Sequence, residues 1–69
     1  MGTVKQEIGE LDGVAFTQAV GKWPIGTQGA VVIDFGDDKM VEIANERGET
    51  LDLPVVPANK LELLAKYSD

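Results

Sequence analysis

The residues best suited to chemistry in this sequence are carboxylates that follow one another closely. Asp34, Asp37, Asp38 and Glu42 fall within one short span, and carboxylate oxygens at that density attract hard cations such as calcium. The spacing lacks the regular Asp-x-Asp-x-Asp-Gly pattern of a calcium loop. Turns also select aspartate, because its side chain bonds to nearby backbone. The sequence therefore favours a solvated turn over a metal site.

Nucleophilic catalysis lacks an activating group in this chain. The sequence contains no histidine and no cysteine, so it has neither an imidazole base nor a thiolate, and it lacks the usual zinc ligands. The glycines Gly26 and Gly29 precede an apolar stretch instead of a helix, and no lysine follows them, so they predict a turn and not a phosphate-binding loop. We expect a protein that is not an enzyme and holds no metal or cofactor.

The residue best suited to binding a partner is Trp23, the single tryptophan, which lies beside Pro24 in a glycine-rich loop. An indole in this position either folds back over one end of a small core or contributes a binding hot spot, and both interpretations stay open. The candidate interaction surface comprises Trp23, Pro24 and Tyr67, together with the turn carboxylates Asp37 and Asp38.

Charge narrows the class of partner. The 69 residues include 6 basic and 12 acidic side chains, which gives a net charge of −6. Phosphate backbones and anionic bilayers repel such a domain, so nucleic-acid and membrane binding are disfavoured. The first residues form no apolar signal segment, and the longest aliphatic run covers residues 30–33 only. We expect a cytoplasmic protein.

The elements that must position these side chains are predicted to be strands. Residues 11–17 carry Val14 and Phe16 at period two, and residues 18–29 form a long loop. Residues 30–35 are a continuous apolar run, which predicts a central strand covered on both faces, with Phe16 and Phe35 in the core.

Two further segments alternate between apolar and polar residues. Residues 40–45 place Val41 and Ile43 on one face and Glu42 on the other, which predicts a half-exposed strand of a hairpin. Residues 50–55 alternate with Leu51, Leu53 and Val55 facing one way. Pro54 has no N–H, so this strand is predicted to lie at an edge or to lose its ladder there.

The segment 57–67 allows two predictions. Asn59 and Glu62 have the spacing of a variant capping box, which favours a short helix. Leu61 and Leu63 alternate with polar neighbours, which favours a 3₁₀ turn followed by a fifth strand. Both alternatives remain open.

About five short strands with a long loop after the first predict an all-β fold, namely a small antiparallel barrel with the element order of SH3-like barrels. Its expected divisions are a flexible leader over residues 1–9, one barrel over 10–66 and a tail over 67–69.

Several short motifs resemble a bacterial family of small proteins catalogued as domain of unknown function 4926, over roughly residues 10–64. The motifs are Leu11-Asp12-x-Val14, Ile25-Gly26-x-x-Gly29-x-Val31-Val32, Val41-Glu42-Ile43, Gly48-Glu49-Thr50, Leu53-Pro54 and Pro57-Ala58-Asn59-Lys60-Leu61. The resemblance implies an SH3-like barrel in a bacterial, soluble protein, often encoded near toxin-like or accessory genes. It implies no activity.

Together these features predict a non-catalytic interaction module, acting as the acidic partner or inhibitor of a basic protein encoded nearby. One alternative is a structural homo-oligomer that pairs through the strand containing Pro54 or through the leader. Another is nucleic-acid binding through a glycine turn like that of KOW domains.

Overall fold

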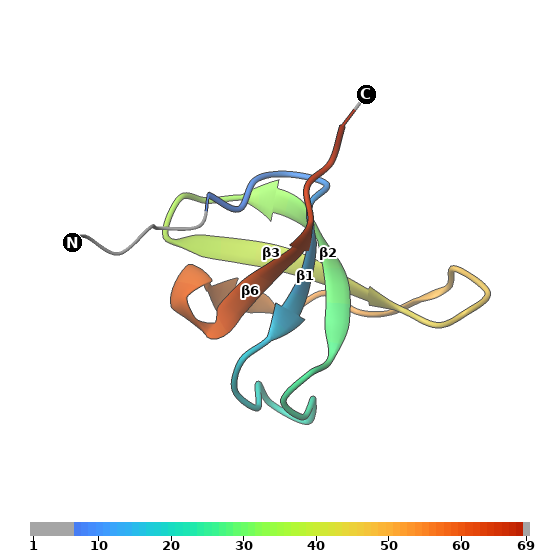
Figure 1. Ribbon diagram of the computed structural model, residues 1–69. Coiled ribbons are helices and arrows are strands. Elements are labelled where there is room, and N and C mark those ends of the chain that lie inside the picture. The colour runs from blue at the N-terminus through green and yellow to red at the C-terminus, as the bar shows by residue number, and fades with distance from the viewer. Residues whose placement is uncertain (1–6, 69) are drawn as a thin grey trace.

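The computed structural model describes residues 7–68, and the predictions for residues 1–6 and 69 lie outside that range. The described chain forms strands and one short 3₁₀ turn (Figure 1). In chain order they are β1 (Gly13–Phe16), β2 (Gln28–Asp34), β3 (Asp38–Ala44), β4 (Thr50–Asp52), β5 (Val55–Pro57), η1 (Ala58–Lys60) and β6 (Leu61–Ala65).

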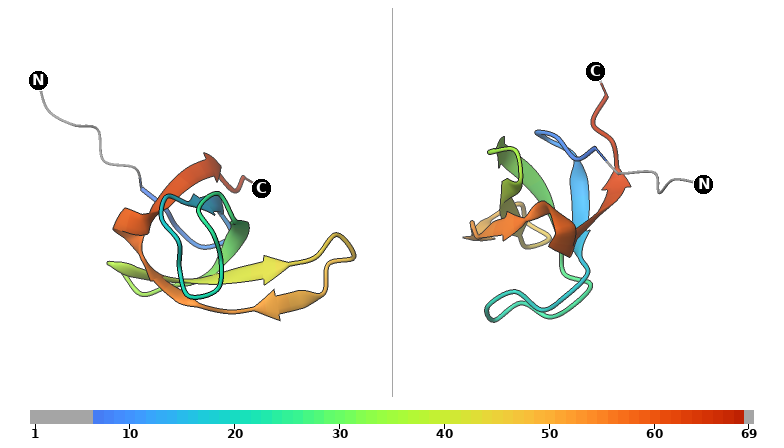
Figure 2. Two further views of the ribbon diagram at one scale, coloured as in Figure 1. Left: turned by 90° about the horizontal axis from the view of Figure 1, so that it is seen from below. Right: turned by 90° about the vertical axis from the view of Figure 1, so that its left-hand side faces the viewer.

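The strands form one antiparallel sheet in the order β4-β3-β2-β1-β6, with β5 also paired to β3. The sheet curls, and η1 bridges its two ends (Figure 2). At that bridge the Ala58 N–H donates to the Asp37 carbonyl oxygen, and the Thr17 N–H donates to the Lys60 carbonyl oxygen, both at 2.8 Å. The predicted all-β class, barrel arrangement and element order are confirmed.

The open prediction for residues 57–67 is decided by tertiary pairing. The chain makes the 3₁₀ turn η1 and then continues as β6, in which Leu61 and Leu63 pair with Phe16 and Val14 of β1. Because cross-strand partners share a face of the sheet, this pairing directs both leucines toward the core. The period-two pattern was thus the better predictor here, and the short helix does not form.

A small apolar core fills the barrel. Its buried members are Ile8, Val14, Phe16, Val31, Val41, Ile43, Val56 and Leu61, with Val20, Trp23 and Leu63 packed against them. The predicted inward faces of the first and third strands are confirmed. Ile8 is buried as well, so the packed part of the chain begins before the boundary expected at Glu10.

The prediction that residues 30–35 are covered on both faces is wrong for their second half. Phe35 is 56% exposed and Ile33 39% exposed, so Phe35 is not a core residue. The reason is a register shift between Val31 and Ile33. Val31 pairs with buried Val41, whereas Ile33 pairs with Met40, which faces the other way along β3. A bulge of one residue therefore turns Ile33 out of the core.

Pro54 divides the fourth predicted strand in two, as expected from its missing N–H. The Val41 N–H donates to the Pro54 carbonyl oxygen at 2.9 Å, but proline offers no N–H for the return bond. The ladder is interrupted between β4 and β5 while both strands remain beside β3. Beyond this point β3 and β4 project from the barrel as a hairpin (Figures 1 and 2).

Candidate functional site

A group of exposed and half-buried apolar side chains lies on the outer face of the sheet, across β2, β3 and β5. Met40 of β3 pairs with Ile33 on one side and with Val55 on the other, and paired residues share a face. Leu53 and Leu51 continue the group along the edge of the sheet. We call these five residues the outer apolar face, and Ile33, Leu51, Leu53 and Val55 are 39%, 51%, 47% and 51% exposed.

The outer apolar face has an acidic border. Asp38 and Glu42 flank Met40 on the same side of β3, because side chains alternate along a strand. The Glu42 carboxylate accepts a hydrogen bond from the Thr50 hydroxyl, which fixes it at the base of the projecting hairpin. The border therefore presents negative charge on both sides of an apolar centre.

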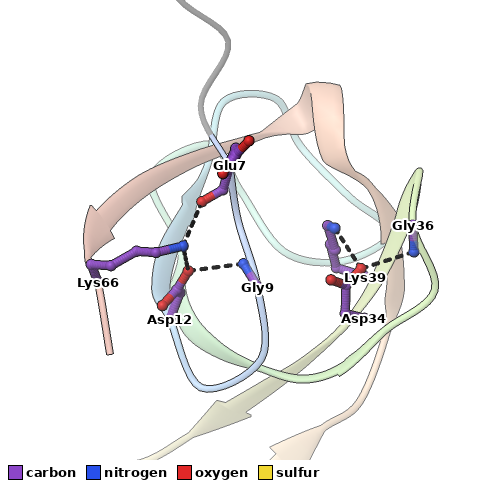
Figure 3. Close-up of polar contacts among 7 residues, drawn as sticks. All are labelled: Glu7, Gly9, Asp12, Asp34, Gly36, Lys39 and Lys66. Carbon is purple, nitrogen blue, oxygen red and sulfur yellow. Dashed lines mark hydrogen bonds and ion pairs between the residues drawn. The ribbon is translucent and has the colours of Figure 1, made fainter. Parts of the chain in front are cut away.

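The turn between β2 and β3 is held rigid by Asp34. One carboxylate oxygen accepts hydrogen bonds from the Gly36 N–H at 2.8 Å and from the Lys39 ammonium at 2.6 Å (Figure 3). The bond from Lys39 is the main reason why the pKa of Asp34 lies below its ordinary value, followed by the bond from Gly36. The Lys39 side chain is only 7% exposed, so its charge is neutralised within this ion pair.

A groove of about 600 Å³ runs beside this turn. Its walls are the β2–β3 turn on one side and η1 on the other, and residues 7–8 also line it. The lining residues are Glu7, Ile8, Gly36, Asp37, Asp38, Lys39, Pro57, Ala58 and Asn59. Within residues 7–68 the carboxylates of Asp37 and Asp38 have no hydrogen bond or ion pair. The lining therefore combines the apolar residues Ile8, Pro57 and Ala58 with negative charge that is unpaired in this range.

Residues 7–12 are fastened to the barrel by the buried carboxylate of Asp12. It accepts hydrogen bonds from the N–H groups of Gly9 and Tyr67, at 2.8 and 2.7 Å, and from the Lys66 ammonium at 2.9 Å. Lys66 also donates to the Glu7 carbonyl oxygen (Figure 3). The three hydrogen bonds to the Asp12 carboxylate lower the pKa of Asp12 to about 2, and the bond from the Gly9 N–H is the largest cause. We call this arrangement the Asp12 clasp.

Trp23 lies at the edge of the core, in a tight turn closed by reciprocal backbone bonds with Val20. Its indole N–H donates to the Asp52 carboxylate at 2.7 Å, and this bond is the main cause that lowers the pKa of Asp52. The Lys22 ammonium stands 5.2 Å from the ring centroid. Trp23 thus has defined packing contacts, and a role in binding stays a prediction.

The structure separates the residues of the predicted interaction surface. Trp23 and Pro24 follow the end of β1, whereas the Tyr67 backbone is bonded to Asp12, just before β1 begins. Tyr67 therefore lies at the opposite end of β1 and cannot flank Trp23. Asp37 and Asp38 do lie together, at the groove.

The outer apolar face was not identified as a surface from the sequence. The alternation of Leu51, Leu53 and Val55 was visible, but alternation alone does not say which face is inside. The signal that would have helped is Val56, an apolar residue out of phase with these three, which the structure shows to be fully buried. Ile33 gave no such signal, because its orientation depends on the bulge.

The four carboxylates considered as a cation site do not converge. Asp34 is paired with Lys39, and Glu42 is bonded to Thr50. In the described part of the chain no group of three or more acidic residues is placed to hold a metal ion. No helix formed by residues 7–68 is long and apolar enough to span a bilayer.

No family model, no curated protein and no solved structure matches this chain. The resemblance to the family of domain of unknown function 4926 therefore stays a prediction from the short motifs.

Proposed function

We propose that this protein is a non-catalytic interaction module that binds another protein through the outer apolar face. The observation that carries the proposal is the row Ile33, Met40 and Val55, which crosses three strands in direct register, with Ile33 and Val55 exposed and Met40 half-buried between them. Continuous exposed apolar surface with a polar border is characteristic of protein-binding sites. A module with neither histidine nor cysteine suits binding better than catalysis.

The acidic composition of the chain also supports a partner that carries basic residues around an apolar centre, because opposite electrostatic potentials favour docking. We place this interaction in the cytoplasm of a bacterium, following the motif resemblance and the absence of cysteine. An inhibitory or accessory role toward a protein encoded nearby agrees with the same resemblance.

The test compares two double variants with the wild type in capture from a native extract at low and moderate salt. Met40→Ser with Val55→Ser removes apolar contact from the outer apolar face. Ile25→Ser with Leu64→Ser makes the same chemical change at two exposed residues elsewhere, 68% and 49% exposed. We expect one stoichiometric partner with the wild type and the control, and its loss with the first variant. No stoichiometric partner, or an unaffected first variant, would overturn the proposal.

Self-association is the competing use of this face, and sedimentation at micromolar concentration separates the two. We expect a monomer, since the acidic border of one copy would face that of the next. The free edge of β4 also offers one N–H fewer for pairing, because the Leu53 N–H donates to the Asp52 carboxylate at 2.9 Å. A dimer abolished by the Met40→Ser, Val55→Ser change would identify a homo-oligomer instead. Retarded migration of RNA or DNA at low salt would point to nucleic-acid binding.

A further inference from the structure

We infer that the groove between the β2–β3 turn and η1 receives an extended, lysine- or arginine-bearing segment of the partner. This inference rests on the proposed function, and it adds a second, chemically different contact. The groove adjoins the outer apolar face, because the pair Asp38–Pro57 follows the pair Met40–Val55 in the same ladder. A partner lying on that face has a short path into the groove.

The charge of the lining selects a cation. Among residues 7–68, Lys39 is the single basic residue that lines the groove, and Asp34 neutralises it. The other charged residues that line it within this range are Glu7, Asp37 and Asp38. The two aspartates are exposed and unpaired among the described residues, so a lysine or arginine gains their attraction without breaking an existing ion pair.

The shape and polarity of the lining favour an extended segment with alternating character. Ile8, Pro57 and Ala58 supply apolar surface, while the carboxylates stand along one wall. Successive side chains of an extended peptide point to opposite sides. A peptide that alternates lysine with valine can therefore direct its cations to Asp37 and Asp38 and its apolar side chains toward Pro57 and Ala58.

Both walls of the groove are fixed before any ligand arrives. The Asp34 carboxylate holds the turn through Gly36 and Lys39, and the Ala58 N–H bond to the Asp37 carbonyl oxygen ties the turn to η1. A site whose walls are already ordered loses little conformational freedom on binding. The carboxylates thus stand on a rigid frame.

The probe is a capped pentapeptide that alternates lysine and valine, titrated into the full chain at low salt and followed by backbone amide shifts. We expect saturable shifts at Gly36, Asp37 and Ala58, and none with the matching glutamate–valine peptide. Asp37→Asn with Asp38→Asn should weaken binding about 3- to 10-fold, as expected for two exposed ion pairs. Glu46→Gln with Glu62→Gln removes the same charge from exposed positions elsewhere and should leave binding unchanged.

Equal weakening by the two double variants, or equal binding of both peptides, would overturn the inference. So would binding that requires deletion of residues 1–6, since that segment would then be the occupant. Partner capture distinguishes the two proposals. If Met40→Ser with Val55→Ser loses the partner while the Asp37→Asn, Asp38→Asn variant keeps both partner and peptide, the proposed function stands and this inference fails. If only the aspartate variant loses them, the groove is the binding site and the proposed role of the outer apolar face fails.

Discussion

The indole N–H of Trp23 donates a 2.7 Å hydrogen bond to the carboxylate of Asp52, although the two residues are 29 positions apart. The bond joins the loop between β1 and β2 to strand β4, at the base of the projecting hairpin. Since Trp23 also packs against the core, one side chain connects the long loop, the core and the hairpin. The loop is therefore part of the folded unit.

Replacing Trp23 should separate packing from hydrogen bonding. Trp23→Ala removes both and should lower the free energy of unfolding by about 1–3 kcal/mol, as expected for a partly buried aromatic residue. Trp23→Phe keeps most of the packing and should cost less. Urea unfolding followed by circular dichroism measures both, since no tryptophan remains for fluorescence. Equal losses would mean that the bond to Asp52 accounts for the whole effect.

The Asp12 clasp should make the protein sensitive to acid. The pKa of Asp12 falls from 3.8 to about 2 on folding, so its carboxylate stabilises the fold above pH 3.8, and that contribution is lost as the pH falls toward 2. Asp12→Asn should lower stability at pH 7 and flatten its decline in this range. Asp37→Asn, at a carboxylate without a partner among residues 7–68, is the control. Urea midpoints across the range test this, and an unchanged slope in Asp12→Asn would contradict it.

Gly29 should not tolerate a side chain. A Cβ atom built there would stand 2.6 Å from the Glu42 carbonyl oxygen and 2.6 Å from Val41 Cγ1, because β2 and β3 approach closely. Gly29→Ala should therefore cost about 1–3 kcal/mol through overpacking. At Gly13 the nearest atom would be 3.6 Å away, so Gly13→Ala is the matched control and should be far milder. Thermal unfolding of the two variants measures both losses of stability, and equal losses would contradict the prediction.

The two neighbouring valines of β5 should lose very different amounts of stability when each is replaced by threonine. Val56 is fully buried and Val55 is 51% exposed. Val56→Thr buries a hydroxyl group in the core and should cost about 1–3 kcal/mol, whereas Val55→Thr should stay within about 0.5 kcal/mol of the wild type. Denaturant titration of both variants measures the difference. A large loss in Val55→Thr would show that the outer apolar face serves folding and not binding.

Much of the fold follows from local pattern. Alternation located β1, β3 and β4, and Pro54 marked the point where the ladder breaks. Less of the candidate site could be predicted from local pattern. Asp37 and Asp38 were singled out and do lie together at the groove, but Tyr67 and Trp23 were grouped and lie at opposite ends of β1. Sequence proximity finds residues on one turn, whereas a surface built from several strands depends on how those strands pair.

The sequence by itself determined the class of the protein: a small, acidic, all-β chain with no imidazole or thiol for catalysis. Those properties depend on composition and on period-two alternation, which are local. Only the tertiary structure decided which alternating face is buried. One bulge beside Val31 turned Ile33 outward, and cross-strand pairing placed it in line with Met40 and Val55. A shift of one residue exchanges the two faces of a strand, and no local pattern reports that shift.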